Sequence, residues 1–520
     1  MEEIVASHQS RVANRGDAVA IDDRTCNDLL LDEVFQAIDR TESTLGRHAL
    51  YHRLRTAHGD ESLRVFEALV TRMSDDPSCR ERTQLALGRL RDPHGYNLWW
   101  LGRPDAIDAP AWYALFPILT VLTLALALLL IGYPGLLPLV VGLLVLNFAV
   151  HLATFRRIDA AAAAFRQIAP LVATGQALRF LGGDDIEPIA ASFRHDTALL
   201  RRLKTISRWV SGDPLMLSVH PHPAAAMIAD PISVFYDYVN FVLPVHASGV
   251  YLGAATVQAG ASSLLDLMAA IGDVDATVSV ASLRANQFQW TRPRFTPKGS
   301  SAVITEAIHP LLTNGVPNSI TLAPGAGVLV TGSNMSGKST FLRTVGITTV
   351  LAQSLHTCFA NGYEAPLLHV RSCIGRADDL VGGKSYYMVE VEALLELVQA
   401  SHGNTSQLFL LDELFRGTNA VERIAGAEAV LTELNGGGSR PHVVIAATHD
   451  GELVGLLAGS YAPYHFGDTL TDEELSFDYH LQPGRATSRN AIALLRLNGA
   501  PPALVDRALA SAAKLDRQRG

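Results

Sequence analysis

The sequence is poor in cysteine, and its cysteines are not paired in the way that zinc sites require. The chain has 520 residues and four cysteines, Cys26, Cys79, Cys358 and Cys373, with no C-x-x-C motif. Disulfide-rich scaffolds concentrate many cysteines in a short chain, and structural zinc sites use closely spaced pairs. The sequence therefore predicts neither class and favours a reducing compartment. Residues 1–17 also lack the apolar stretch of a secretory signal.

Charged residues are scarce as well, and their balance is acidic. They make up 18% of the chain, and 42 Lys and Arg against 51 Asp and Glu leave a formal net charge of −9. This balance argues against a protein that coats nucleic acid through bulk charge, although it leaves room for a local basic face. With 48% hydrophobic residues the chain can bury a large core, and its length predicts three or four structural units.

The absence of charge is complete between Ala109 and Phe155, where no Asp, Glu, Lys or Arg occurs. A single helix of this length would extend about 70 Å, more than twice the bilayer core of roughly 30 Å. The segment Gly132–Gly135 (GYPG) divides the stretch and predicts a turn. We therefore expect a transmembrane helical hairpin over residues 109–155, with spans at Trp112–Ile131 and Leu136–Leu152. The alternative is a buried helical hairpin inside a large soluble core.

Both flanks of this stretch carry arginine, at Arg103 and at Arg156-Arg157. Arginine and lysine are enriched on the cytoplasmic side of membrane spans, so the flanks predict cytoplasmic ends with only the turn outside. The expected location is a bacterial-type inner membrane, with both termini and the C-terminal domain in the cytoplasm.

The remainder of the chain divides into helical and α/β parts. Residues 1–108 and 156–264 are expected to form an all-α core or lever, because apolar residues recur at helical spacing, for example across Leu29–Leu54. From Phe295 onward short β-like runs alternate with helices, as in an α/β domain, which we expect to span residues 265–520. His220-Pro-His222-Pro is interpreted as a loop rather than a metal site, because no cysteine or acid lies beside it.

A nucleotide-binding motif follows a predicted strand at Val328–Thr331. It reads G-x-x-x-x-G-K-S and comprises Gly332, Ser333, Asn334, Met335, Ser336, Gly337, Lys338, Ser339 and Thr340. Glycines let backbone N–H groups curl around phosphates, and the N-terminus of the following helix adds a favourable dipole. Lys338 supplies positive charge to the β- and γ-phosphates, and the Ser339 hydroxyl is a ligand for Mg²⁺. The strand–loop–helix context predicts a P-loop that binds ATP.

Two further strands are expected to complete this site. Leu408–Leu411 leads into Asp412, which is suited to the Mg²⁺ shell, and Glu413, which is suited to orienting or deprotonating water. Val443–Ala447 leads into Thr448-His449-Asp450, where His449 is a candidate sensor of the γ-phosphate or a structural residue. The pattern predicts a Mg²⁺-dependent P-loop ATPase with Lys338, Glu413 and His449 in catalytic roles.

The motifs around this site resemble the ATPase domain of the MutS family of DNA mismatch-repair proteins. The resemblance rests on Thr331–Thr340 (TGSNMSGKST), Asp412–Asn419 (DELFRGTN) and Ala447–His449. Ile374–Glu392 is similar to the family's intersubunit loop, in which the serine at the position of Ser385 reaches the γ-phosphate of the partner subunit. The resemblance therefore implies a homodimer with composite ATP sites and C-terminal dimerisation helices. A weaker similarity over Ile21–Thr56 implies that the family's helical core begins there.

The chain departs from the family at several places. Too few residues precede Ile21 for the mismatch-reading and connector domains, and Phe66-Glu67 lacks the spacing of the family's Phe-x-Glu wedge. We therefore expect a membrane-anchored variant without these two domains. In the P-loop the family has Pro at Ser333 and Gly at Ser336. Gly315 stands where an aromatic residue usually packs on adenine, and His480 is the candidate contact on the other side of the base.

By resemblance, the expected function is an ATP-driven dimer or clamp that acts on DNA, with mismatched DNA as its ligand. A basic cluster, Arg201, Arg202, Lys204 and Arg208, is either a DNA contact or an ordinary solvated helix face. The first alternative is a nucleotide-gated structural or signalling ATPase at the inner membrane without a repair role. The second is a transporter ATPase, which the sequence disfavours because it has no LSGGQ-type loop and no charge within the spans.

Overall fold

The chain folds into two compact units, each assembled from separate stretches of sequence. The computed structural model describes residues 1–15, 20–102, 115–183, 186–194, 198–211, 243, 245–286, 289–333, 335–374, 386–436, 442–470, 475–485, 491–497 and 499–519. The first unit, here called the helical unit, contains Met1–Asp17, Ile38–His52 and Asp60–Asn286. The second, the α/β unit, contains Ala18–Ala37, Arg53–Gly59 and Gln287–Gly520. An α/β part combined with a helical part agrees with the predicted fold class.

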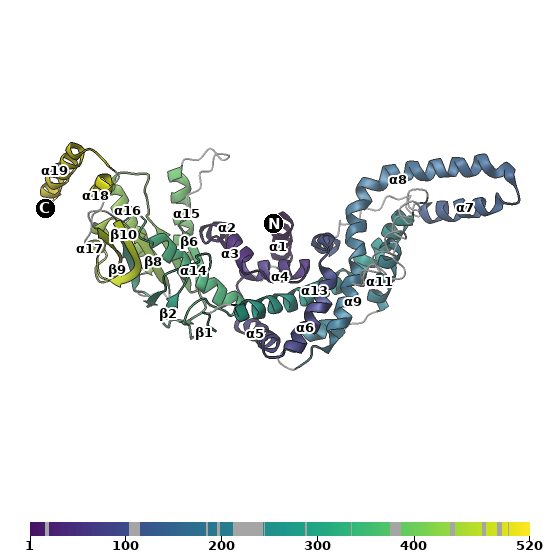
Figure 1. The fold of residues 1–520 in the computed structure, drawn as a ribbon, viewed down its shortest axis with the longest axis horizontal. Helices are drawn as coiled ribbons and strands as arrows, with labels where there is room; N and C mark the ends of the chain where they lie inside the picture. Colours follow the sequence, from purple (N-terminus) through teal and green to yellow (C-terminus); the bar gives the residue numbers. More distant parts are fainter. Residues whose placement is uncertain are drawn as a thin grey trace. The chain divides into compact units, whose positions relative to one another are not determined.

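The helical unit contains helices alone among its described residues (Figure 1). Short 3-10 helices occur at Gly88–Leu90, Pro93–Gly102, Pro134–Leu136 and Leu178–Phe180. The α-helices are α1 (Glu2–Arg15), most of α4 (Thr44–Leu54), α5 (Asp60–Asp75), α6 (Pro77–Leu87), α7 (Leu115–Leu129), α8 (Leu137–Arg166), α9 (Ile168–Ala177), α10 (Glu187–Arg194), α11 (Ala198–Ser211) and α13 (Val245–Asn286).

The 42-residue helix α13 is the element against which most of this unit packs. Two of its glycines allow neighbouring helices to approach closely. A Cβ atom at Gly253 would lie 2.7 Å from the Phe165 ring of α8, and one at Gly272 would lie 2.9 Å from the Leu45 carbonyl oxygen of α4. Since real Cβ atoms do not approach other atoms this closely, larger residues at these positions would push the helices apart.

A buried carboxylate on α13 ends the preceding helical stretch. Asp275 accepts hydrogen bonds from the backbone N–H groups of Glu42 (2.8 Å) and Ser43 (2.7 Å), and from the Ser43 hydroxyl (2.6 Å). These donors lie just before α4, so Asp275 satisfies N–H groups that the helix leaves unpaired. The stretch Leu29–Leu54, in which apolar residues recur at helical spacing, is divided into α3 (Leu31–Ile38) and α4. Burial raises the pKa of Asp275 to about 7.

Phe66-Glu67 has a structural role in this unit. Phe66 is buried in α5, and Glu67 forms a two-point ion pair with Arg284 near the end of α13, at 2.6 and 2.9 Å. The Arg284 side chain is only 3% exposed. Removal of one partner of such a pair typically costs about 3–5 kcal/mol, because the other charge stays buried. These contacts agree with the interpretation that this dipeptide is not a DNA-reading wedge.

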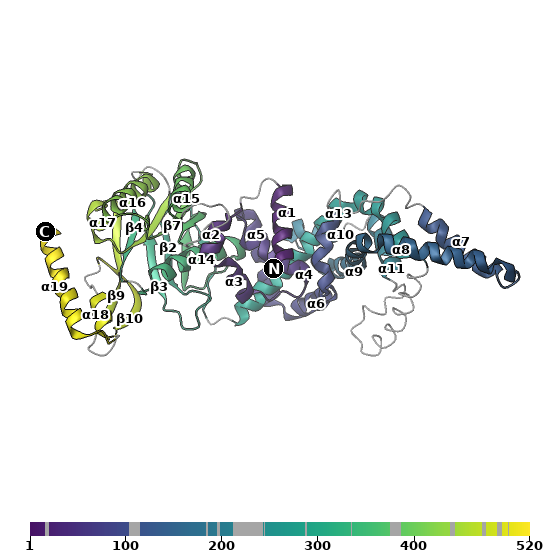
Figure 2. The same cartoon turned by 90° about the horizontal axis from the view of Figure 1, so that it is seen from above.

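The uncharged stretch forms a helical hairpin, with α7 and α8 side by side in Figures 1 and 2 and joined by the predicted turn. Among the described residues, one helical stretch, Pro134–Ala153, is long and apolar enough to cross a membrane, with a mean hydropathy of 2.3 and 17% of it buried. Helix α7 is apolar but shorter, at 15 residues, and residues 103–114 before it are not described. The prediction of two full spans is therefore not supported.

The α/β unit is built on a six-stranded sheet with the order β10-β9-β4-β8-β7-β6. Five strands are parallel, and β10 pairs antiparallel with β9. The strands are β4 (Gly327–Thr331), β6 (His369–Cys373), β7 (Gln407–Asp412), β8 (Val443–Thr448), β9 (Tyr461–Leu470) and β10 (Leu475–Pro483). The predicted strands Val328–Thr331, Leu408–Leu411 and Val443–Ala447 are therefore confirmed.

Helices cover both faces of this sheet (Figure 2). One face packs against α15 (Tyr386–Ser401), α16 (Ala420–Asn435) and α17 (Gly451–Leu456), through a core that includes Phe409 and Leu411 of β7. The intervening Leu410 contacts Gly346 of α14 (Lys338–Leu355), which lies on the other face. This alternation follows from the two-residue period of a strand. The C-terminal helices are α18 (Ala491–Leu497) and α19 (Pro502–Arg519).

A second sheet of four strands precedes and follows the P-loop helix in sequence. Its order is β1-β5-β2-β3, formed by β1 (Arg294–Phe295), β5 (Gly362–Ala365), β2 (Ala302–Ala307) and β3 (Asn318–Leu322). Residues between β2 and β3, including His309 and Gly315, line the cavity described below. The small sheet therefore supplies one wall of the site.

The early segment Ala18–Ala37 belongs to the α/β unit. Helix α2 (Asp23–Asp28) lies beside the edge strand β6, where Asp28 accepts from the Ser372 hydroxyl (2.7 Å) and the Ile374 N–H (2.8 Å). The Asp28 carbonyl also accepts from Arg343 of α14 at 2.8 Å. Unpaired strand edges tend to recruit other strands, so α2 covers an exposed edge as well as holding α14.

The division into units falls at places other than the boundaries expected from the sequence. The expected start of the ATPase domain at residue 265 lies inside α13, which continues without a break to Asn286. Residues 18–37 and 53–59, expected in the N-terminal helical part, are in the α/β unit. The His220–His222 segment lies outside the described residues.

Candidate nucleotide site

The P-loop connects β4 to α14 through glycines in conformations that other residues rarely adopt. Gly332 has φ +149° and Gly337 has φ +106°. Gly337 immediately precedes α14, and a Cβ atom on it would lie 3.2 Å from the ring of Tyr479. Lys338 is the first residue of the helix, and its Nζ donates to the carbonyls of Gly332 and Ser333, both at 2.8 Å. The lysine therefore lies inside the curve of its own loop.

The environment of Lys338 is suited to a bound anion. Burial lowers the pKa of the lysine, and the nearby Asp412 carboxylate opposes this effect. A further negative charge beside a buried lysine stabilises its charged form, because attraction to that charge offsets the cost of removing the ammonium group from water. Phosphate oxygens at the N-terminus of α14 would supply such charge.

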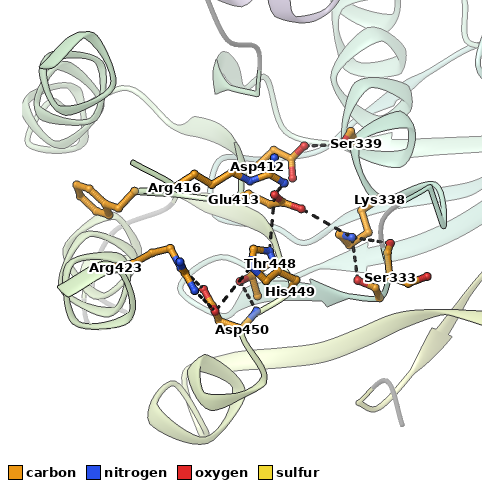
Figure 3. Close-up of polar contacts among 12 residues, drawn as sticks. Ser333, Lys338, Ser339, Asp412, Glu413, Arg416, Arg423, Thr448, His449 and Asp450 are labelled. Carbon is orange, nitrogen blue, oxygen red and sulfur yellow. Dashed lines mark hydrogen bonds and ion pairs between the residues drawn. The ribbon is translucent and has the colours of Figure 1, made fainter. Parts of the chain in front are cut away.

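The end of β7 brings two carboxylates to the same edge of the sheet (Figure 3). The Ser339 hydroxyl donates to Oδ2 of Asp412, which places two hard oxygen ligands side by side. The N–H of Glu413 donates to the Ala447 carbonyl at 2.9 Å. Its carboxylate lies 3.9 Å from Lys338 Nζ and 3.7 Å from His449 Nδ1.

The end of β8 supplies a third group of polar residues. Asp450 forms a two-point ion pair with Arg423 of α16, at 2.7 and 2.9 Å, and its N–H donates to the Thr448 hydroxyl at 3.0 Å. His449 lies between Asp450 and Glu413 in Figure 3 and is 44% exposed. The fixed Asp450 thus defines where the His449 backbone lies, while the imidazole stays accessible.

These elements surround a cavity of about 610 Å³, a size in the range of cofactor and small-molecule sites. Of the predicted residues, Met335, Gly337, Lys338, Ser339, Thr340 and Glu413 line it. Asp412 lies beside Ser339, Ser336 is buried in the loop, and Asn334 and Ser385 lie outside the described residues. His309 also lines the cavity, and burial near Arg343 lowers its pKa to about 4, so it is neutral at pH 7.

The residues of the site fit Mg²⁺ bound together with a phosphate-bearing ligand rather than a protein-only metal cage. Mg²⁺ typically takes one or two protein oxygens, with water and phosphate oxygens completing its shell. Ser339 and Asp412 provide such a pair. Within the described part of the chain, no group of three or more His, Cys, Asp and Glu side chains is arranged to hold a metal ion.

The residue of β10 that lines the cavity is not the one expected from the sequence, which was His480. His480 is exposed and is not among the described residues that line the cavity, whereas the preceding Tyr479 does line it. The register between β9 and β10 shifts between Phe477 and Leu481, and Tyr479 has φ +55°. Such a bulge reorients side chains, so strand alternation could not identify which residue faces the cavity.

Gly315 also lines the cavity. A Cβ atom at this position would lie 2.8 Å from Ile308, so the backbone is too close to its neighbour for a larger residue. Phe341, Phe466 and Tyr479 also line the cavity, and of these three aromatic residues only Tyr479 is exposed, so it is the one open to a planar base. Its position is fixed by Asn318, which donates to the Tyr479 carbonyl (3.0 Å) and accepts from the Leu481 N–H (2.7 Å).

The comparison with protein families agrees with this geometry. Residues 328–516, which include β4, the P-loop, β7, β8 and the C-terminal helices, match the family described as MutS domain V. This match assigns residues 328–516 to the MutS domain V family. The relationship of the chain to individual members is confined to about half of its length.

Three relatives illustrate the extent of the similarity to MutS proteins. The DNA mismatch repair protein MutS of Natronomonas pharaonis is 32% identical over 260 residues, and that of Thermus thermophilus is 34% identical over 255 residues. DNA mismatch repair protein MutS 2 of Halobacterium salinarum is 33% identical over 249 residues. These matches cover 46–48% of this chain but only 28–30% of the relatives.

Sequence reasoning missed several residues of this site, among them Arg416 and Tyr479, both of which line the cavity. Arg416 contacts the Glu413 carboxylate. It lies three residues after Glu413 in the same loop, and this spacing could have predicted an ion pair between the two side chains. Tyr479 gave no such signal, because its orientation depends on the bulge.

We predict that Tyr479→Ala weakens ATP binding roughly tenfold, since stacking of a base on an aromatic ring contributes about 1–3 kcal/mol. Affinity for inorganic tripolyphosphate, which has no base, should not change. His480→Ala is the matched control, because His480 is adjacent but outside the cavity. Calorimetric titration of both ligands into each variant distinguishes the two residues, and equal losses for ATP and tripolyphosphate would contradict a stacking role.

Proposed function

We propose that the chain is a Mg²⁺-dependent ATPase that works as a homodimer on DNA and is anchored in a membrane by the α7–α8 hairpin. The observation that carries the catalytic part is the convergence of Lys338, Ser339 and the Asp412-Glu413 pair on one cavity. Each of these groups has a defined role in phosphoryl transfer.

In this proposal the P-loop N–H groups and Lys338 bind the phosphates, and Ser339 and Asp412 hold Mg²⁺. The metal, when bound, neutralises charge on the phosphates during transfer. Glu413 orients the attacking water and accepts its proton, while Lys338 and Arg416 compensate the negative charge of this carboxylate. His449 lies beside Glu413 and contacts the γ-phosphate end of the ligand. Ser385 of the partner subunit completes the site, as the resemblance to the family implies.

We predict that Lys338→Ala abolishes ATP binding, whereas Glu413→Gln retains binding and lowers the hydrolysis rate at least a hundredfold, the scale of general-base catalysis. The matched control is Glu433→Gln, an exposed carboxylate on α16 away from the cavity. The measurements are ATP affinity by titration and phosphate release at saturating ATP and Mg²⁺. Hydrolysis that survives in Glu413→Gln would remove Glu413 from its proposed role.

DNA is proposed as the partner because all three relatives named above are DNA mismatch repair proteins. The basic cluster on α11 offers a modest surface for it. Arg201 and Arg202 are exposed, whereas Lys204 donates to Gln176 at 3.1 Å and Arg208 is partly buried. The net charge of −9 requires that any DNA contact be local.

We predict that double-stranded DNA stimulates ATP hydrolysis at physiological salt. Arg201→Ala/Arg202→Ala should weaken the stimulation and leave the rate without DNA unchanged, because each lost phosphate contact reduces affinity and its salt dependence. Phosphate release with and without DNA across a salt series measures both effects. An ATPase that does not respond to DNA would favour the structural or signalling alternative.

Membrane insertion is supported by the surface of the hairpin. Fifteen large apolar side chains between residues 115 and 152 are exposed. They are Leu115, Ile118, Val121, Leu122, Leu124, Leu128, Leu129, Ile131, Tyr133, Leu137, Leu139, Val141, Val145, Leu146 and Leu152. Transfer of each from water to hydrocarbon gains on the order of 1 kcal/mol, so lipid is the environment that this surface fits. The Arg103 and Arg156-Arg157 flanks support a cytoplasmic location for the ATPase part.

We predict that the protein is released from membranes by detergent and not by alkaline carbonate. Val121→Asp/Leu128→Asp/Val145→Asp should convert it to a carbonate-extractable or soluble form, because each carboxylate in the apolar layer costs about 2.5–3.5 kcal/mol. Leu85→Asp on α6, also at an exposed leucine, is the matched control and should stay membrane-bound. Quantitative blotting of the fractions gives the answer, and wild-type protein in the carbonate wash would overturn the anchor.

A further inference from the structure

The loop that carries Glu413 has an unusual backbone. Both Glu413 (φ +51°) and Phe415 (φ +57°) lie in the left-handed region, which L-residues other than Asn and Asp seldom occupy. A bulky aromatic residue in this conformation is held there only by its surroundings. Phe415 is therefore the residue whose packing decides the course of the loop.

Two helices hold Phe415 in place. Its N–H donates to Oε1 of Glu390 on α15 at 2.5 Å. Its ring lies against Gly426 of α16, where a Cβ atom would approach ring atom Cε2 to 3.1 Å. The ring also contacts Tyr387 of α15, with ring centroids 6.4 Å apart at an interplanar angle of 51°. The loop is thus fixed by a hydrogen bond on its backbone and by packing on both sides of one side chain.

Tyr387 makes a second contact with the same loop. A Cβ atom at Gly417 would lie 3.2 Å from Cδ2 of Tyr387, so this side chain covers the Gly417 backbone. Tyr387 and Glu390 are three residues apart on α15 and lie on one side of the helix. Residues 413–417 are therefore held from one direction by a single helical turn.

The charged residues on either side of Phe415 belong to the site already described. Glu413 lies within 3.9 Å of Lys338, and Arg416 contacts the Glu413 carboxylate. A change in the backbone at residue 415 would move both of these groups, because only Leu414 separates Phe415 from Glu413. The P-loop would not move with them, since it is connected to β4 and α14 instead.

We propose that Phe415, held by Tyr387, Glu390 and Gly426, is a positioning residue that aligns Glu413 and Arg416 for ATP hydrolysis without taking part in ATP binding. This inference rests on the proposed ATPase function. The phenylalanine ring, rather than the backbone conformation alone, supplies the alignment. Glycine at this position keeps the left-handed conformation freely but loses the two packing contacts.

The test compares Phe415→Gly and Phe415→Tyr in the full-length protein. Phe415→Gly should lower kcat about tenfold or more, a fraction of the loss from removing a general base, while its Kd for ATP stays within about twofold of the wild type. Phe415→Tyr keeps the ring and should retain more than half of the rate. Tyr387→Ala should show the same split between kcat and Kd, and adding it to Phe415→Gly should cause less further loss than it causes alone, because the contact between the two rings is already absent.

The control is Leu395→Ala, an exposed leucine on α15 away from the loop, which should leave kcat and Kd unchanged. An unchanged kcat in Phe415→Gly, or a parallel loss of kcat and ATP affinity, overturns the positioning role. Should Phe415→Gly fail to fold, Tyr387→Ala decides by the same two readouts. A wild-type protein that binds ATP without hydrolysing it would instead overturn the proposed function, and this inference with it.

Discussion

The parallel pairing of β4, β8 and β7 is the constraint on which the site depends. Thr331 is in register with Thr448, and Asp412 is in register with Ala447, so the three strands end within one residue of each other. The loops that follow them therefore begin at one edge of the sheet, although Thr331 and Asp412 are 81 positions apart in sequence and Asp412 and Thr448 are 36 apart. A shift of one residue in either ladder would reverse the faces of the strand and remove the carboxylates from the P-loop.

This sheet is not completed by the C-terminal half alone. Leu29 contacts Gly346 of α14, and Arg53 donates to the Ser354 carbonyl at the end of the same helix, at 2.9 Å. Together with Asp28, these residues hold the helix that begins with Lys338. The chain then passes between the units five times, so α14 is linked by short segments to the start of the helical unit.

The sequence was sufficient to predict the motifs whose chemistry requires a preceding buried strand, and to predict those strands. Lys338, Ser339 and the Asp412-Glu413 pair follow buried strands, and a P-loop needs that arrangement wherever it occurs. The features that the sequence did not reveal concern residues governed by distant contacts. The break after Ile38 depends on Asp275, more than 230 residues away, and the choice of Tyr479 over His480 depends on a bulge. Phe415 belongs to the same class, because Tyr387 and Gly426 sustain its conformation.

The α7–α8 hairpin buries polar side chains and exposes apolar ones, which is the reverse of a helical hairpin in a soluble protein. Asn147 and Thr123 are 1% and 3% exposed, and Asn147 Nδ2 donates to Thr123 Oγ1 between α8 and α7 at 2.9 Å. The outward positions are occupied by leucine, isoleucine and valine. In water this arrangement would leave the apolar side chains exposed and bury a polar pair, which is unfavourable. In hydrocarbon the inward hydrogen bond would hold the two helices together, and the outward apolar side chains would contact lipid. The buried-hairpin alternative requires the reverse, since only 17% of Pro134–Ala153 is covered by protein.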